Sequence, residues 1–167
     1  MKRLFIYKML WLLLLLPFFS GCNDTDDVAA IFTGKEWKLN FIALDGKHEM
    51  FDFWDNPANE QKSMEQLNKA GTYIIRFEGT TEDDVITGQV KGKVTTSDLN
   101  GTWNANGKNN KFKATVKGSD NGDILATKFL EGLNAATSYE GDKNNLYLLY
   151  QSNNRTFRIV FRPVSNN

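Results

Sequence analysis

The sequence contains one cysteine, Cys22, and one histidine, His48, among its 167 residues. A single cysteine cannot form a disulfide within the chain. With one cysteine and one histidine, the chain lacks the usual set of nitrogen and sulfur ligands for a zinc site. A catalytic Ser-His-Asp or Cys-His arrangement would have to use His48. We expect His48 to be an exposed polar residue just after a turn. The sequence predicts no catalytic residue, no metal site and no cofactor.

A surplus of basic residues is also missing, because 20 Lys and Arg residues balance 20 Asp and Glu residues. A protein that binds nucleic acid would show a clustered basic excess, so we expect no nucleic-acid partner. Long apolar runs are scarce as well. The uncharged stretch of residues 9–21 has 13 residues, whereas a helix needs about 20 to span a bilayer.

That short apolar stretch lies inside an arrangement that is typical of a secretory signal. Lys2, Arg3 and Lys8 precede it, and small residues close it. Removing residues 1–21 would remove these three basic residues and no acidic one, which leaves a mildly acidic mature chain. The sequence predicts a signal peptide over residues 1–21.

The end of the signal resembles the bacterial lipobox, in which a cysteine thiol is acylated and the chain is cut just before it. Ser20 and Gly21 supply the small neighbours of Cys22, and Phe19 stands where the motif usually has Leu. We expect cleavage between Gly21 and Cys22, and a lipid anchor of two or three acyl chains, such as palmitate, on Cys22. The alternative is an ordinary signal peptide with an incidental cysteine.

Three carboxylates follow within residues 23–27. Such a charge run is typical of a solvated tether, so we expect a lipidated acidic tether over residues 22–30. It also resembles a surface-export signal of Gram-negative bacteria. The predicted location is the cell envelope, anchored to the outer membrane on its surface or its periplasmic face.

The remaining chain, residues 31–164, favours one β-rich domain. Alternation and turn signals predict a first hairpin whose strands, residues 36–42 and 47–54, are joined by Asp45-Gly46. Further strands are expected at residues 73–77, 84–94, 99–105, 111–117, 145–151 and 155–162. The strand at 73–77 is expected to end at Glu78-Gly79.

Two segments change to a helical period. Residues 59–70 predict a short surface helix that ends at Gly71. Residues 124–136 carry an apolar helical stripe, and Asp123 is a suitable N-cap because its carboxylate can accept hydrogen bonds from the first turn. The predicted fold is mainly β, a curved antiparallel sheet or partial barrel with one main packed helix.

Some polar and aromatic groups remain as candidate binding residues. The carboxylates in residues 82–84 and 120–123 are suitable ligands for calcium, although the second cluster is also explained by a turn and an N-cap. Trp54 and Trp103 are candidate residues of a glycan or small-molecule site, although aromatic residues at strand spacing are more often core. Paired carboxylates would be needed for a hydrolase, and no motif supplies them.

The layout resembles the META-domain superfamily, small β-rich domains found on bacterial envelope lipoproteins. The parallels are the opening strand at residues 33–39, the core strand at 73–77, the Asn100-Gly101-Thr102-Trp103 turn, the helix at 124–133 and the closing strands. The segment before that helix and the insert at residues 52–71 depart from the family pattern. This resemblance implies no catalytic residues.

These observations favour a non-enzymatic binding or structural role in the cell envelope. The expected partners are the membrane, through the N-terminal lipid, and another envelope protein. A glycan or small-molecule binding module is the alternative, and a hydrolase based on carboxylates ranks third.

Overall fold

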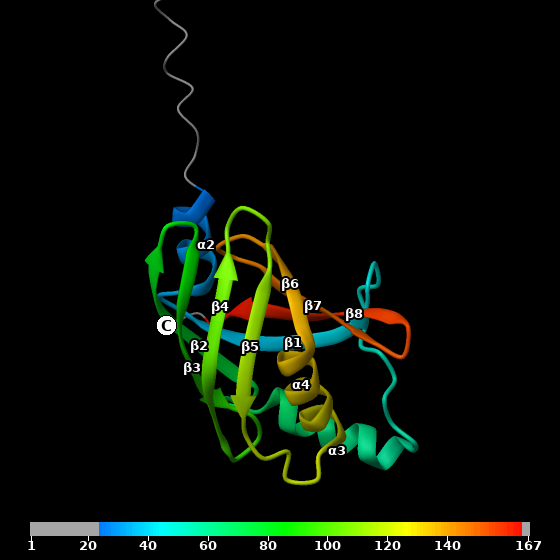
Figure 1. The fold of residues 1–167 in the computed structure, drawn as a ribbon. Coiled ribbons are helices and arrows are strands. Elements are labelled where there is room, and N and C mark those ends of the chain that lie inside the picture. Colours follow the sequence, from blue (N-terminus) through cyan, green and yellow to red (C-terminus); the bar gives the residue numbers. More distant parts are fainter. Residues whose placement is uncertain (1–23, 165–167) are drawn as a thin grey trace, which may run out of the picture.

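The computed structural model describes residues 24–164, and these residues form one curved antiparallel sheet of eight strands with three helices (Figure 1). The expected mainly-β fold class is confirmed; the sheet is not closed into a barrel. Along the chain the elements are α2 (Asp24–Phe32), β1 (Glu36–Leu44), α3 (Pro57–Asn68), β2 (Ile74–Glu82), β3 (Val85–Lys93), β4 (Asp98–Asn106), β5 (Phe112–Lys117), α4 (Ile124–Ala135), β6 (Ala136–Gly141), β7 (Leu146–Ser152) and β8 (Arg155–Pro163).

The strand order is β5-β4-β3-β2-β1-β8-β7-β6, so β5 and β6 are the two edges. The edges meet at one end, where Lys111 and Ser138 form an isolated bridge and the Tyr139 amide donates to the Asn110 carbonyl at 3.0 Å. Further along β5, the side-chain amide of Asn134 on α4 takes the place of a strand. Its Oδ1 accepts from the Val116 amide at 2.9 Å, and its Nδ2 donates to the Val116 carbonyl at 3.3 Å. The outward backbone N–H and C=O of Val116, on the β5 edge, are therefore satisfied by a helix side chain.

The predicted first hairpin is wrong. Asp45-Gly46 does turn the chain, with Gly46 at a φ of 77°, but residues 47–54 form no strand. Strand β1 pairs instead with β2 and β8. Phe51 keeps one strand-like contact, since its amide donates to the Ile42 carbonyl at 2.8 Å. Pairing with β8 is favoured because seven residues of β8 pair with β1, and Phe157 and residues 159–161 of β8 are buried.

The predicted tether over residues 22–30 is also wrong where the structure describes it. Residues 24–32 form helix α2, and its Val28, Ile31 and Phe32 side chains belong to the hydrophobic core. The ordered domain thus begins before residue 31. The acidic residues suggested a solvated segment, but three apolar residues at helical spacing follow them, and burial of this stripe fixes the helix.

Most other predicted elements are confirmed, with shifted ends. Helices α3 and α4 match the expected helices, and the Asp123 side chain caps α4 by accepting from the Ala126 amide at 3.0 Å. Strand β2 does not end at Glu78-Gly79 but continues to Glu82, because β3 pairs with it along its whole length. Strand β6 was not expected.

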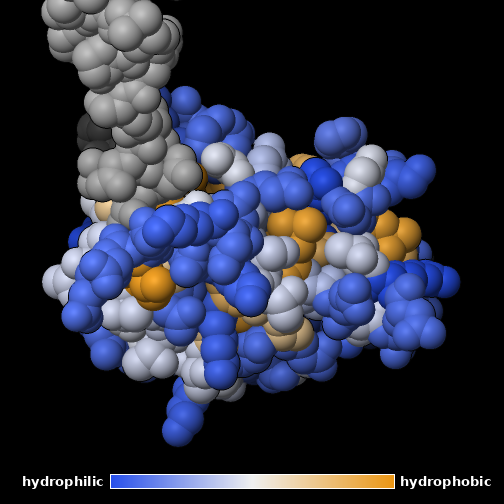
Figure 2. Space-filling model, turned by 45° about the horizontal axis from the view of Figure 1, so that its top comes forward, coloured by the Kyte–Doolittle hydropathy of each residue, from blue (hydrophilic) through white to orange (hydrophobic). Residues whose placement is uncertain are grey.

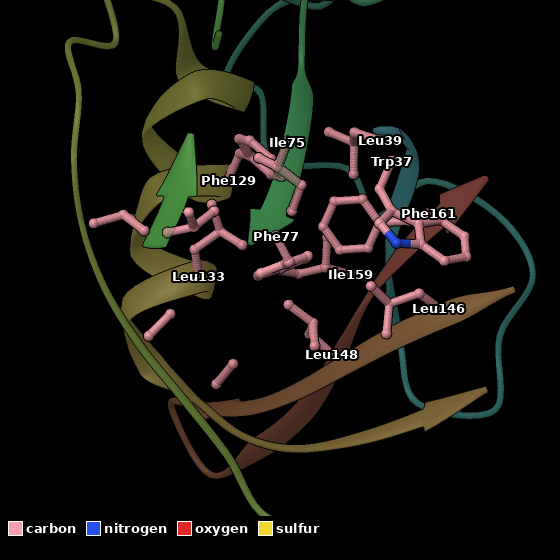
Figure 3. Packing of buried hydrophobic residues seen from close by; sticks show 14 of the residues in the cluster. Trp37, Leu39, Ile75, Phe77, Phe129, Leu133, Leu146, Leu148, Ile159 and Phe161 are labelled. Atoms are coloured by element: carbon pink, nitrogen blue, oxygen red, sulfur yellow. The ribbon is translucent and has the colours of Figure 1, made fainter. Parts of the chain in front are cut away.

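The core lies between the sheet and the helices α2 and α4. Figure 3 shows Phe129 and Leu133 of α4 directed towards Ile75 and Phe77 of β2, with Ile159 of β8 close by. A Cβ atom on Gly132 would lie 2.9 Å from Ile159 Cδ1 and 3.0 Å from Tyr150 Cε1. The missing side chain of this glycine lets α4 approach β7 and β8 closely.

Candidate functional site

A groove of about 310 Å³ lies where α4, the irregular segment after β1 and the β7–β8 hairpin meet. Four aromatic side chains line it, together with five polar ones. The aromatic residues are Phe51, Phe53, Tyr150 and Phe157, and the polar residues are Lys128, Glu131, Ser152, Asn153 and Arg155. We call this feature the aromatic groove.

Phe157 is the centre of the aromatic wall. Its ring stacks on Tyr150, with centroids 5.4 Å apart and 18° between the planes, and on Phe53 at 6.0 Å and 29°. Phe51 meets Phe157 edge-on at 5.2 Å. Tyr150 and Phe157 are buried, whereas Phe51 and Phe53 are half-buried. The two half-buried rings are therefore the aromatic surface that a ligand can contact.

The β7–β8 hairpin sets the position of Phe157. Asn153 and Asn154 form its two-residue loop with φ of 50° and 59°, the left-handed conformations that a type I′ turn requires and that Asn tolerates. This loop fixes the register in which Tyr150 lies opposite Phe157. The two-residue asparagine loop thus places the ring of Phe157 against that of Tyr150.

The segment that carries Phe51 and Phe53 is tied down at both ends. Asp45 forms an ion pair with Arg158, and its amide donates to the Thr156 carbonyl at 2.9 Å. At the other end Asn56 caps α3, since its Oδ1 accepts from the Asn59 amide at 3.0 Å. The two phenylalanines therefore sit on a fixed loop.

The polar side of the groove combines one paired and one unpaired charge. Lys128 Nζ lies 2.8 Å from Glu131 Oε2. The Arg155 guanidinium is exposed, and within residues 24–164 it has no ion pair or hydrogen bond. Burial and the charge of Glu131 raise the pKa of the Tyr150 phenol to about 12, so this hydroxyl is neutral at pH 7. The groove offers hydrogen-bond donors and an acceptor beside apolar rings.

A shallower hollow of about 400 Å³ lies across β3, β4 and β5. Its lining is mostly threonine and other small residues, and Lys113 is its one charged residue. Trp103 lines it but is only 2 % exposed. With no accessible aromatic surface, this hollow is the weaker candidate.

The structure does not bring the two predicted tryptophans together. Trp103 packs among buried rings near α2, and its Nε1 donates to the Glu78 carbonyl at 3.1 Å. Trp54 is half-buried beside α3, where its Nε1 donates to Ser63 Oγ at 2.9 Å. Trp54 does not line the groove, and its ring lies 6.2 Å from that of Phe53, centroid to centroid.

The two carboxylate clusters that were considered as calcium ligands, residues 82–84 and 120–123, make contacts within the fold, and Asp84 forms an ion pair with Lys108. Asp120 accepts from the Gly122 amide and the Thr127 hydroxyl. Asp123 is buried and its Oδ1 accepts from Ser63, Tyr73 and Ala126. Within residues 24–164, no group of three or more His, Cys, Asp or Glu residues is arranged to hold a metal ion.

His48 is exposed, as expected. The predicted cleavage site, Gly21 and Cys22, lies outside the described residues. In the described part of the chain, no helix combines the length and apolarity needed to cross a membrane.

Sequence reasoning missed Phe51 and Phe53 as site residues, because both were assigned to a strand. The signal that was available is the run Phe51-Asp52-Phe53-Trp54, in which three aromatic residues follow a turn without strict alternation. Tyr150 and Phe157 were assigned to the correct strands, but their contact with this run depends on tertiary structure.

A family described as "Domain of unknown function (DUF4847)" matches residues 23–163. The chain belongs to the DUF4847 family. A solved structure agrees: the crystal structure of a DUF4847 family protein from Bacteroides vulgatus superposes with a TM-score of 0.60 at 22% identity, over 84% of this chain and 99% of that one. At this identity the likeness shows the fold alone. The search of curated proteins finds no match.

Proposed function

We propose that this DUF4847 chain is a lipid-anchored, non-enzymatic binding protein of the bacterial cell envelope. The order of basic residues, apolar stretch, small residues and Cys22 supports the anchor. The family match begins at residue 23, directly after the proposed acylated cysteine. The resemblance to META-domain lipoproteins points to the same compartment, the outer membrane on either face.

The observation that carries the binding role is the aromatic groove, with two half-buried phenylalanines beside an unpaired arginine. Ligand sites are concave, mostly apolar and supplied with a few polar groups that orient the ligand. A saccharide fits this composition, because a sugar ring has an apolar C–H face and a polar edge of hydroxyls. The face would lie on Phe51 and Phe53, and the hydroxyls would reach Asn153, Glu131 and Arg155.

The same groove supports binding without hydrolysis. Glycoside hydrolysis requires two carboxyl groups on opposite sides of the scissile bond, about 5–10 Å apart. Among the described residues that line the groove, Glu131 is the one with a carboxylate, and it is paired with Lys128. A sugar bound in the groove would therefore lack the second carboxyl group that hydrolysis requires.

Binding can be tested on an array of hexose, N-acetylhexosamine and uronic-acid oligosaccharides. We expect the intact domain to retain a subset, and Phe53→Ala and Arg155→Gln each to weaken retention. Lys113→Gln, in the shallow hollow, is the matched control and should leave retention unchanged. Retention that survives both groove variants would place the ligand elsewhere. No retention together with capture of an envelope protein would favour the protein-partner role.

The anchor can be tested by mass spectrometry of the mature N-terminus. We expect acyl groups on Cys22, and Cys22→Ser should release the chain from the membrane fraction or leave its signal uncut. An unmodified N-terminus at another position would contradict the anchor without bearing on the groove.

A further inference from the structure

The proposed lipid anchor and the first helix are almost adjacent in the sequence. Cys22 precedes Asp24, the first residue of α2, by two positions. A chain spans at most about 3.6 Å per residue, so α2 would begin within about 7 Å of the acylated residue. This inference rests on the anchor part of the proposed function.

Helix α2 is fixed firmly to the sheet. Phe32 has no exposed surface and its ring lies 4.8 Å from Trp103, 5.0 Å from Tyr139 and 5.1 Å from Phe77. Lys35 Nζ donates to the Ala30 carbonyl at 2.8 Å and to the Lys143 carbonyl at 2.7 Å. A lipid on Cys22 would therefore hold the whole domain close to the bilayer, since no flexible arm separates α2 from the sheet.

The same contacts identify the end of the domain that would lie nearest the membrane. The Lys35 bond ties α2 to the β6–β7 turn, and Figure 1 shows α2 beside that turn and the β2–β3 and β4–β5 turns. An ion pair between Lys108 and Asp84 joins the last two. We call residues 80–84, 107–111 and 141–145, with α2, the anchor end.

The surface of the anchor end suits lipid headgroups. Its three turn segments consist of threonine, asparagine, glycine, lysine and acidic residues, so charges of both signs are present. Figure 2 turns this end towards the viewer and shows hydrophilic residues over most of it, with hydrophobic residues in separate patches. Such a surface can hydrogen-bond to headgroups, whereas entry into hydrocarbon would strip its polar groups of water at high cost.

We propose that the anchor end rests on the headgroups of the bilayer that holds the acyl chains of Cys22. The domain then has one defined orientation on the membrane. The aromatic groove contains Ser152 and Arg155 at the opposite end of β7 from the β6–β7 turn. A strand of seven residues spans about 23 Å, so this part of the groove and the β6–β7 turn lie at opposite ends of that span.

Spin labels on the full-length acylated protein test this orientation. Labels are introduced at Thr81→Cys and Asn144→Cys in the anchor end and at Ala58→Cys in α3, all exposed positions. Acylated Cys22 has no free thiol and does not react. In phosphatidylcholine vesicles that contain a nickel-chelating headgroup lipid, we expect the first two labels to relax several-fold more strongly than the third.

A flexible insertion is the matched control. Twenty Gly and Ser residues between Asn23 and Asp24 have a root-mean-square reach of about 25 Å, so the three labels should then relax alike. Equal relaxation in the uninterrupted protein, with acylation confirmed by mass spectrometry, would overturn the orientation and leave the anchor standing. Absence of acylation would overturn both, while the groove is judged separately by the glycan array.

Discussion

Two clusters of aromatic rings lie at different places in this fold, and they differ in their access to solvent. Phe32, Phe77, Trp103, Phe112 and Tyr139 pack near α2, and each is at most 3 % exposed. Phe51, Phe53, Tyr150 and Phe157 line the aromatic groove, and the first two are half-buried. The first cluster is closed by α2. Among residues 24–164, α4 borders the second cluster but leaves Phe51 and Phe53 half-buried. Rings of the same chemistry therefore form core in one place and a candidate site in the other.

The closed cluster should be the more sensitive to truncation. Phe32→Ala removes a fully buried ring that contacts four others. We expect a loss of about 3–5 kcal/mol in the free energy of unfolding, from lost burial and the cavity left behind. Urea unfolding followed by tryptophan fluorescence measures it. A loss below about 1 kcal/mol would mean that α2 is not part of the stable core.

A buried polar network joins α3 and the start of α4 to Trp54, the residue after the groove residue Phe53. Asp123 accepts from Ser63 and Tyr73, and Ser63 in turn accepts from Trp54, which follows the groove segment. Asp123→Ala leaves buried donors unsatisfied and removes the cap of α4, so we expect a loss of about 2–4 kcal/mol. Asp123→Asn keeps an acceptor oxygen and should lose clearly less. Equal losses in urea unfolding would argue against the network.

Truncation of a ring in the open cluster should weaken saccharide binding more than it lowers the free energy of unfolding. Phe53→Ala removes a half-buried ring that solvent already reaches. We expect a loss of about 1 kcal/mol or less in the free energy of unfolding, since surface positions contribute little, but a clear loss of saccharide retention. A loss as large as that of Phe32→Ala would show that Phe53 is core rather than site.

Tyr150 in the groove should also make the free energy of unfolding depend on pH. Burial and the charge of Glu131 raise the pKa of Tyr150 to about 12, whereas the pKa of tyrosine in an unfolded chain is about 10. Folding favours the neutral phenol. The contribution of the Tyr150 phenol to the free energy of unfolding is therefore complete below about pH 10 and is lost as the pH rises through about 12. Tyr150→Phe should flatten the fall in unfolding free energy over this range, and an unchanged slope would contradict the raised pKa.

The sequence predicts much of this fold because local patterns and packing agree. In β5, Phe112, Ala114 and Val116 alternate with exposed polar residues, and at α4 the cap Asp123 precedes an apolar stripe. The prediction fails where tertiary contacts determine which strands pair. Residues 47–54 follow a favourable hairpin turn, yet β1 gains more by pairing with β8.

The candidate site depends even more on tertiary structure. The stacking of Phe157 on Phe53 joins segments that are about a hundred residues apart in the chain. Trp103 met the same sequence criteria as a ligand residue but packs against Phe32 of α2. The three acidic residues in the first turn of α2 had made this helix look like a tether. Composition alone cannot separate a buried ring from an accessible one.

The most direct test of this account compares the two clusters in one titration. Backbone amide NMR spectra of the Cys22→Ser chain are recorded while the oligosaccharide best retained on the array is added. The account predicts shifts concentrated at residues 51–53, 128–131 and 150–157, with little change near Phe32 and Trp103. Shifts centred on the Trp103 region, or no shifts at saturating sugar, would contradict the assignment of the aromatic groove as the binding site.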